Sequence, residues 1–495
     1  MKFVFVCSGA ENLAAEQLSA ILKQKGHEVE LAFDAALFDD KVYFYIPWLY
    51  RLFDKRKQVI KDIVESNADI IGFTVFTDNY EWACHMAKEV KKQLPNTPII
   101  FGGIYPTTCP EVVIKNDFVD MVCVGEAEES IPELLESMQQ GRIDYTIRNL
   151  WFKNNNKIIK NSQRPLVDLE TLPPYDKSLF EGNVPLKRVY LTVTSRGCPF
   201  GCSFCSQNFM IKFNKGIDRR KMSVGKVITE LRVMKEKYHF KEVDFKDNIF
   251  NTDKKWTLEF LKRYKKEIGL PYRALGHVLF MDKEIAKAYK ESGCHRLQFG
   301  IQTLNEQTRH KYLFRYETNT QIEKALNACD EAGLDYCCDH MFGLPGEGEE
   351  DYIEATRFYK KLKHCTRVTC FWTTFLPKTD LVKIAKERGA INDEDIEAIN
   401  HARAGYYYCE GSVKDVDLKK TIRNYQMLYR IMPVMPEKAV DFVLEHRLHK
   451  YLYLLPQLPI LLAIDLIVSV MKYDNSAFQY MHYYFLHIKK RILGG

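Results

Sequence analysis

The stretch Thr194-Ser-Arg-Gly-Cys-Pro-Phe-Gly-Cys-Ser-Phe-Cys205 carries three cysteines within eight residues. It follows an apolar segment at 189–194, where a parallel βα barrel would place a catalytic loop. Three closely spaced thiolates can bind three corners of an iron–sulfur cube and leave the fourth iron open to another ligand. A structural zinc site is the alternative, but such sites need four ligands and no second cysteine pair lies nearby. Cys198, Cys202 and Cys205 are therefore candidate ligands of a [4Fe–4S] cluster.

Strands and helices alternate along the chain on both sides of this loop. Six repeats of a short apolar segment and an amphipathic segment suit a parallel βα barrel, complete or partial. The predicted strands are 189–194, 242–245, 272–275, 296–300, 335–342 and 367–371, with helices near 224–238, 254–267, 283–292, 320–333 and 350–362.

The first part of the chain shows an earlier series of the same kind. It predicts a doubly wound, Rossmann-like α/β sheet, whose ligands bind beyond the carboxyl ends of the strands. The segment after the first strand, Cys7-Ser-Gly-Ala-Glu-Asn12, lacks the Gly-x-Gly-x-x-Gly pattern of dinucleotide sites. The predicted strands are 2–6, 29–33, 70–75, 99–102 and 119–124, with helices 12–25, 49–66, 80–93 and 129–139.

These patterns predict an α/β protein in four parts. We expect a sheet domain at 1–142, a hairpin-like linker at 143–184, a barrel at 185–392 and a mostly helical region at 393–495. In the helical region, Cys409 follows three tyrosines and is expected in the core, with the active site as the alternative.

The composition narrows the classes of function. A chain of 495 residues with 46% hydrophobic residues can bury several cores. Its net charge of +6 comes from mixed signs and gives no case for nucleic acid. The 14 cysteines are spread through a long chain, which favours a reducing cytosolic compartment over a secreted disulfide scaffold. The apolar run at 3–6 is too short for a signal peptide.

Four motifs resemble those of the radical S-adenosylmethionine (SAM) enzymes. They are the cysteine loop with Phe204 before its last cysteine, the segments 242–250 and 299–303, and Gly343-Leu-Pro-Gly-Glu347, each after or within a predicted strand. The resemblance implies that SAM binds the open iron and yields a 5′-deoxyadenosyl radical when the cluster gives it an electron. A low-potential donor such as flavodoxin or ferredoxin is implied as partner. The SAM pocket implied by these motifs comprises Phe204, Asp247, Asn248 and Gln302, where many members carry glutamate in place of Gln302. No catalytic acid or base is assigned.

The sheet domain resembles the cobalamin-binding domain of the cobalamin-dependent radical SAM class. The likeness rests on residues 69–77, on Gly-Gly-x-x-Pro-Thr at 102–107 and on Gly-Glu-x-Glu at 125–128. The Asp-x-His-x-x-Gly motif is absent, so no histidine ligand to cobalt is predicted from it. The cobalamin contacts implied by this resemblance are Ser8, Thr74, Thr77, Gly102, Gly103 and Glu126.

The last fifty residues join apolar runs to aromatic and cationic residues. This pattern predicts either a helix at a membrane surface or a buried helix pair that packs on the barrel. The stretch 451–471 approaches the length of a membrane span, but its prolines and Asp465 disfavour one. The first alternative adds peripheral contact with the inner face of the membrane to a cytoplasmic location. It also favours a hydrophobic small-molecule substrate, such as a lipid, an isoprenoid or a tetrapyrrole.

The resemblance implies methyl transfer to an unactivated carbon as the leading hypothesis. One SAM would methylate cobalamin, and a second would supply the radical that activates the substrate carbon. Oxidative cyclisation or ring rearrangement by an enzyme of the same class is the first alternative. The second is a cobalamin- or redox-sensing binding protein, which would not need an open iron.

Overall fold

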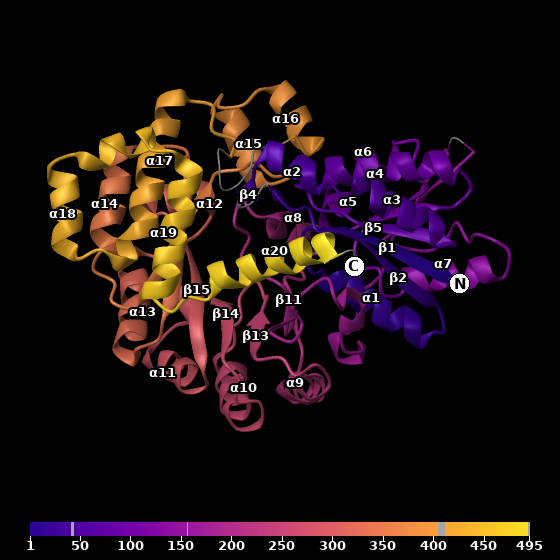
Figure 1. The fold of residues 1–495 in the computed structure, drawn as a ribbon, viewed down its shortest axis with the longest axis horizontal. Coiled ribbons are helices and arrows are strands. Elements are labelled where there is room, and N and C mark those ends of the chain that lie inside the picture. Colours follow the sequence, from indigo (N-terminus) through magenta and orange to yellow (C-terminus); the bar gives the residue numbers. More distant parts are fainter. Residues whose placement is uncertain (41–43, 156, 404–410, 494–495) are drawn as a thin grey trace.

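A computed structural model describes residues 1–40, 44–155, 157–403 and 411–493. Cys409 and the tyrosines before it lie outside the described residues, so the expectations for them stay predictions. Figure 1 shows the sheet domain at one end of the molecule, the second sheet with its helices beside it, and the C-terminal helices across one side.

The first sheet has seven strands in the order β2-β1-β5-β6-β7-β8-β9, and the first five are parallel. Alternate residues of each strand point to opposite faces. Phe3 and Phe5 accordingly pack toward helices α1 and α7, whereas Val4 and Val6 pack toward α3, α4 and α6. The strands are β1 (Lys2–Ser8), β2 (Glu28–Asp34), β5 (Ile70–Thr74), β6 (Ile99–Gly102), β7 (Met121–Cys123), β8 (Leu150–Asn154) and β9 (Lys157–Lys160), and the helices are α1 (Leu13–Gln24), α3 (Arg56–Glu65), α4 (Tyr80–Gln93), α5 (Ile104–Thr108), α6 (Pro110–Ile114) and α7 (Ser130–Gln139). The predicted doubly wound domain is confirmed.

The second sheet has six parallel strands in chain order. Its outward side chains, such as Phe245 and Phe299, share one core with the surrounding helices. Its inward side chains include the charged and polar groups of Arg273, Gln298 and Asp339. The strands are β10 (Val189–Thr192), β13 (Glu242–Phe245), β14 (Tyr272–Gly276), β15 (Cys294–Gln302), β16 (Tyr336–Phe342) and β17 (Cys365–Trp372), and the helices are α9 (Val224–Tyr238), α10 (Lys254–Glu267), α11 (Lys283–Glu291), α12 (Glu306–Leu313), α13 (Asn319–Ala332) and α14 (Glu349–Tyr359). Six strands make a partial barrel, as predicted.

Two expectations change in detail. The single helix predicted at 49–66 is two helices, α2 (Pro47–Phe53) and α3, because the Asp54 carboxylate accepts bonds from the backbone and guanidinium of Arg56 between them. Strands β8 and β9 fall inside the predicted linker, but β8 pairs antiparallel with β7, and β9 with β8, so they extend the first sheet. The rest of the linker lies against α1, where the buried Lys177 ammonium lies 2.7 Å from Glu16.

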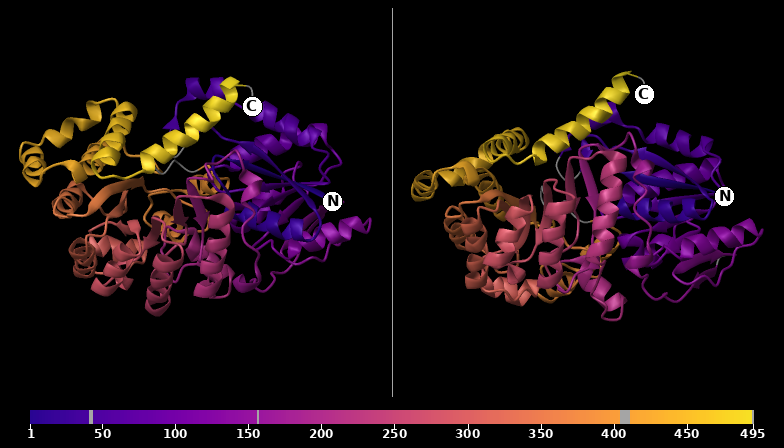
Figure 2. Two further views of the ribbon diagram at one scale, coloured as in Figure 1. Left: turned by 60° about the horizontal axis from the view of Figure 1, so that its bottom comes forward. Right: turned by 90° about the horizontal axis from the view of Figure 1, so that it is seen from below.

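The C-terminal region is helical, and its last helix connects both sheets. Asn475, in the turn before α20, donates to Glu242 of β13 at 2.6 Å. In the middle of α20, the Tyr484 hydroxyl accepts from the Phe38 backbone at 3.1 Å. Figure 2 shows α19 and α20 on an outer side of the molecule in both turned views. The elements are α15 (Asp380–Glu387), α16 (Asp393–Asn400), α17 (Val416–Ile431), α18 (Glu437–Glu445), η5 (Leu448–Leu454), α19 (Gln457–Met471) and α20 (Ser476–Leu493).

Among the described residues, no one helix has both the length and the apolar composition of a membrane span. Leu448–Leu454 and Gln457–Met471 reach that standard only as a pair, and the pair is bent by 119°.

Candidate active site

The cysteine loop begins at a small hairpin after β10. Strand β11 (Ser195–Gly197) pairs antiparallel with β12 (Arg219–Lys221), and Cys205 directly precedes α8 (Ser206–Phe213). Gly197 has a φ of +93°, and a Cβ at this position would clash with the Asp218 carbonyl oxygen. Only glycine fits both constraints. The turn into the first cysteine therefore depends on Gly197.

The three cysteine thiols lie in a desolvated loop. Cys202 is buried, and Cys198 and Cys205 are half-buried. Burial raises the pKa of Cys198 to about 12 and also raises the pKa of the Cys202 and Cys205 thiols. Thiolates at this loop therefore need a cation to balance their charge.

Asp247 fixes the strand end from which the loop starts. Its carboxylate, which is fully buried, accepts from the Thr194 backbone at 2.9 Å and the Thr194 hydroxyl at 2.8 Å, and it also accepts from Ser195. The neighbouring Asn248 amide donates to the Gly197 carbonyl at 3.1 Å. The segment after β13 therefore positions the cysteine loop through four hydrogen bonds.

Arg315 places a buried positive charge beside the loop. Its guanidinium lies 4.0 Å from the Cys202 sulfur and donates to the Gly300 carbonyl and to Glu317, each at 2.7 Å. It also contacts His277 Nε2 at 3.1 Å. Burial, together with the Arg315 charge, lowers the pKa of His277 to about 2, so the imidazole is neutral and can accept this bond. A fixed cation here would stabilise anionic sulfur.

The inner face of the second sheet carries a second polar group. The Asp339 carboxylate accepts from the Gln298 amide at 2.9 and 2.8 Å. Burial raises the pKa of Asp339 to about 7. Gln302 ends β15 with a φ of +67°, next to an irregularity in its pairing with β16. Gln302 lies at the carboxyl end of β15, where barrels place their sites, whereas Gln298 and Asp339 lie in the middle of β15 and β16.

A cavity of about 440 Å³ joins the first sheet to the cysteine loop. It begins at the carboxyl ends of β5 and β6 and continues between the sheet and α1. Its far wall is formed by Val193, Arg196 and Gln207, which flank the three cysteines. Gly103 has a φ of +111°, and a Cβ there would lie 2.6 Å from the Val75 carbonyl oxygen, so glycine is required at this wall. The volume is typical of a small-molecule site.

An ion cluster connects the two domains at the edge of this cavity. Glu126, from the loop after β7, contacts Arg196 at 3.1 Å and also binds Arg220. Glu128 contacts Arg196 at 2.6 Å. Because Arg196 lies two residues before Cys198, the cavity wall and the cysteine loop are mechanically linked.

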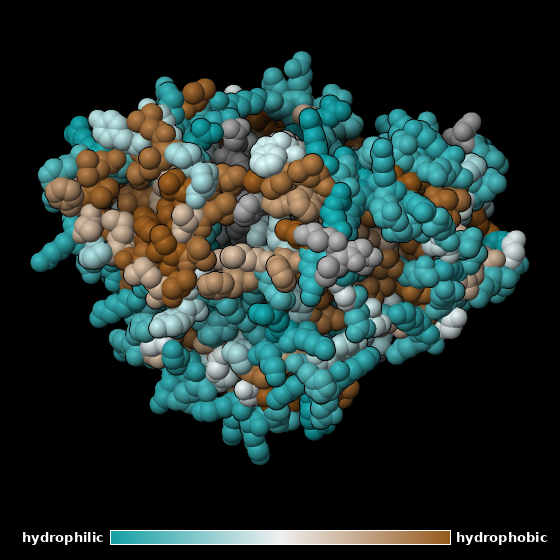
Figure 3. Space-filling view, in the orientation of Figure 1, coloured by the Kyte–Doolittle hydropathy of each residue, from teal (hydrophilic) through white to brown (hydrophobic). Residues whose placement is uncertain are grey.

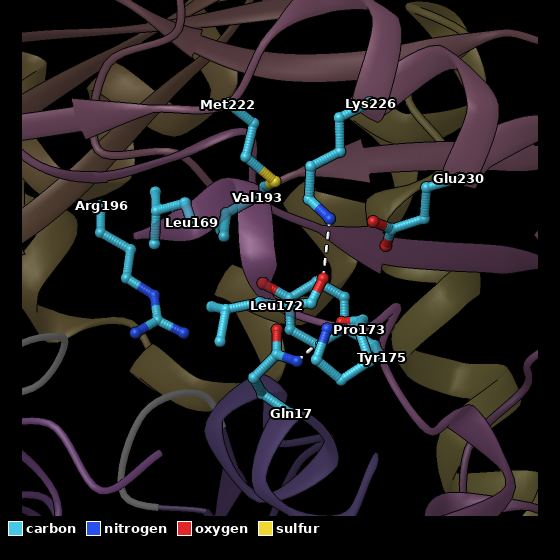
Figure 4. Close-up of a pocket in the computed structure, with 10 residues that line it drawn as sticks. All are labelled: Gln17, Leu169, Leu172, Pro173, Tyr175, Val193, Arg196, Met222, Lys226 and Glu230. Atoms are coloured by element: carbon cyan, nitrogen blue, oxygen red, sulfur yellow. Dashed lines mark hydrogen bonds between the residues drawn. The ribbon is translucent and has the colours of Figure 1, made fainter. Parts of the chain in front are cut away.

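A much smaller pocket, of about 10 Å³, lies next to this cavity and shares Tyr175, Val193 and Arg196 with it. Figure 4 shows the linker between two side chains that bind it: Gln17 donates to the Pro173 carbonyl, and Lys226 donates to the Leu172 carbonyl, each at 2.7 Å. Its volume suits a single water molecule. This junction tethers the linker to both domains.

Comparisons with known proteins match both domains. The B12 binding domain family model matches residues 8–135, and the radical SAM superfamily model matches residues 192–359. The chain belongs to the cobalamin-dependent radical SAM enzymes. The radical SAM domain implies SAM and a [4Fe–4S] cluster, and the B12 binding domain implies cobalamin.

Individual relatives of the enzyme are named for different reactions. It is 32% identical to the uncharacterized methyltransferase PH0819 of Pyrococcus horikoshii, over 61% of this chain and 66% of that protein. It is 24% identical to the anaerobic magnesium-protoporphyrin IX monomethyl ester cyclase of Rubrivivax gelatinosus, over 65% of this chain and 58% of that protein. The alignments thus span two thirds or less of these relatives' length.

A solved structure shares the fold of almost the whole enzyme. The cobalamin-dependent SAM radical enzyme OxsB, with aqua-cobalamin and SAM bound, matches with a TM-score of 0.68 at 14% identity, over 99% of this chain and 79% of that one. At this identity the likeness shows the fold alone.

The residues at the cysteine loop fit an iron–sulfur cluster. No three His, Cys, Asp or Glu side chains among the described residues converge on a single metal ion. A cube differs from such a site because each cysteine binds a different iron. Three thiols without a fourth protein ligand, next to the buried Arg315 charge, match the chemistry of an anionic cluster with one open iron.

The structure places most of the expected site residues either at the cysteine loop or at the large cavity. Asn248 and Asp247 support the cysteine loop, and Phe204 packs with Leu313 and Met341 beneath it. Of the expected cobalamin contacts, Thr74, Gly102, Gly103 and Glu126 line the large cavity, whereas Ser8 and Thr77 are absent from its described lining. Direct contact of any of these residues with SAM or cobalamin stays a prediction. Sequence reasoning missed Arg315 and Arg196, although Arg196 lies inside the stretch that decided the fold.

Proposed function

We propose that this enzyme transfers a methyl group to an unactivated carbon of a hydrophobic small molecule. One observation carries the proposal: a single cavity is lined by the carboxyl edge of the first sheet and by residues on both sides of the three cysteines. The expected cobalamin site and the expected cluster site therefore share one wall. Methyl transfer from one cofactor to a carbon activated by another requires this proximity.

The residue roles follow from position. Cys198, Cys202 and Cys205 would hold the cluster, with Asp247 and Asn248 fixing their loop. Phe204, Gln302 and Arg315 would border SAM. Cobalamin would lie against Thr74, Gly102 and Gly103, and the two glycines, which have no side chain, would let it approach the backbone. Glu126 would act as a positioning residue, because its carboxylate is bound to two arginines.

When bound, the cluster and SAM supply a radical that can remove hydrogen from carbon, and cobalamin supplies the methyl group. The protein's own part is to position these groups and to exclude water. The half-buried Arg196 and the buried apolar side chains of Phe3, Phe5 and Leu18 line the cavity. No proton-transfer residue is needed at the substrate carbon if hydrogen leaves as an atom.

Oxidative cyclisation is the second candidate, because one relative bears the name of a magnesium-protoporphyrin cyclase. An anaerobic assay with reconstituted enzyme, SAM, cobalamin and reduced flavodoxin or ferredoxin separates the two. Methyl transfer to candidate lipids, isoprenoids or tetrapyrroles adds one CH₂ unit to the product mass, and cyclisation does not.

If the reduced enzyme failed to cleave SAM to 5′-deoxyadenosine, both enzymatic hypotheses would be excluded. A cobalamin- or redox-sensing binding protein would then be the remaining hypothesis. A matched Cys202→Ala preparation controls for cleavage by free iron in the same assay.

A further inference from the structure

The C-terminal helices expose an unusually apolar surface. Of the 22 large hydrophobic residues exposed among the described parts of the chain, 12 lie between 448 and 485. Figure 3 shows hydrophobic residues gathered over α17 and α19 and along α20. We call the following set the C-terminal apolar face: Leu448, Tyr451, Leu454, Leu455, Leu466, Ile467, Val470, Met471, Tyr473, Phe478, Met481 and Phe485.

The polarity of these helices is reversed relative to an ordinary surface helix pair. Between 448 and 493 the sequence has two acidic residues, Asp465 and Asp474. Asp474 contacts Arg296 at 2.7 Å and Arg367 at 3.2 Å, and Asp465 contacts Arg367 at 3.3 Å. Both carboxylates therefore point toward the second sheet, while leucine and valine side chains point to solvent. Burial of an apolar stripe does not explain this arrangement.

Cations accompany the apolar face without carboxylates between them. The same segment contains five lysines and arginines, namely Lys450, Lys472, Lys489, Lys490 and Arg491. Lys450 contacts Glu349 of α14, whereas both acidic groups of the segment are withdrawn inward. The outer side of η5, α19 and α20 thus combines apolar, aromatic and positively charged groups. Helices that lie in a bilayer interface have this composition.

We propose that the C-terminal apolar face docks onto the surface of an anionic lipid bilayer. The 119° bend between η5 and α19 prevents them from forming one straight span, so the elements would lie along the interface. Phospholipid headgroups would pair with Lys472 and Arg491, and the apolar side chains would enter the boundary with the acyl chains. This docking goes beyond the proposed methyl transfer and does not depend on it.

A second copy of the chain is a poorer occupant of this face. A two-fold interface would place identical patches against each other, so the cations of one copy would meet those of the other. Such a patch has no carboxylates on its outer side to neutralise them, since Asp474 is bound to Arg296 and Asp465 to Arg367, both in the second sheet. Anionic headgroups provide the missing charge.

Vesicle co-sedimentation tests the proposal with the full-length protein. Vesicles of phosphatidylcholine with phosphatidylglycerol are compared with vesicles of phosphatidylcholine alone. The variant Leu466→Gln/Ile467→Gln/Val470→Gln alters three exposed side chains of α19. The matched control Ile158→Gln/Val233→Gln/Leu279→Gln alters three similarly exposed residues elsewhere. We expect wild type and control to pellet with the anionic vesicles, and the α19 variant to lose about tenfold or more in partition coefficient.

A charge variant, Lys472→Gln/Arg491→Gln, is expected to bind anionic vesicles several-fold more weakly. Equal pelleting of wild type and the α19 variant overturns the proposal, as does the absence of pelleting. A third result would also overturn it: light scattering shows that wild type self-associates and that the α19 variant does not, and neither protein pellets with vesicles. SAM cleavage in solution should be the same in all variants, so failure here is distinct from failure of the proposed function.

Discussion

Replacement of Glu126 with glutamine should weaken the junction between the two domains. The Glu126 carboxylate contacts Arg196 at 3.1 Å, binds Arg220, and accepts from the Val167 backbone at 2.9 Å. The Glu126 side chain is 20% exposed, and the side chains of Arg196 and Arg220 are 23% and 21% exposed. Glutamine keeps one acceptor oxygen but removes the charge that both guanidiniums share.

The expected loss follows from what each arginine retains. Arg196 keeps the Glu128 carboxylate at 2.6 Å, whereas Arg220 keeps the uncharged Val167 carbonyl as an acceptor. Charge-assisted hydrogen bonds contribute about 1.5–3 kcal/mol each, and partial exposure reduces this. We expect Glu126→Gln to lower the free energy of unfolding by about 2–3 kcal/mol, and Glu128→Gln by about 1 kcal/mol.

Urea unfolding followed by circular dichroism measures both losses, and iron content after anaerobic reconstitution measures the effect on the cysteine loop. Burial opposes ionisation of Glu126, but Arg220 and Arg196 outweigh it and hold its pKa below the usual value. The stabilisation is therefore present above the unfolded pKa, about 4.3, and fades as pH falls through the lower folded value. A loss for Glu128→Gln that equals or exceeds that for Glu126→Gln would refute this reasoning.

Three further predictions concern single residues. Cys202→Ala should lose iron and the visible absorbance of the reconstituted cluster, and retained absorbance would exclude this thiol as a ligand. Gly103→Ala should lower cobalamin affinity and stability by more than about 1 kcal/mol, because φ is +111° and Val75 blocks the Cβ, whereas Gly141→Ala meets open space and should leave cobalamin binding unchanged. Asp339→Asn should stabilise the protein relative to wild type above about pH 7. Burial raises the pKa of Asp339 to about 7 in the folded protein. Its contribution to the free energy of unfolding is therefore full below the pKa of the unfolded chain, and a few kcal/mol are lost as pH rises through 7. If the difference in thermal stability between wild type and Asp339→Asn were the same at acid and alkaline pH, this prediction would be contradicted.

Local signals in the sequence identified the elements and the cluster loop. Strand β6 and helices α9 and α10 have the bounds that the apolar patterns of the sequence predict, and the structure shows that Ser223 and Asp253 cap the two helix starts. The spacing of Cys198, Cys202 and Cys205 is a property of a few adjacent residues. It therefore indicated the cluster before any tertiary contact was known.

Contacts between distant residues were decided only by the tertiary structure. Arg315 is 113 residues from Cys202, and Arg220 is 94 residues from Glu126. Periodicity reports which side of an element is apolar, but not which charge meets it across the fold. The same limit explains the C-terminal helices: their composition showed that one side is apolar, and only the ion pairs of Asp465 and Asp474 with the second sheet determined that this side faces outward.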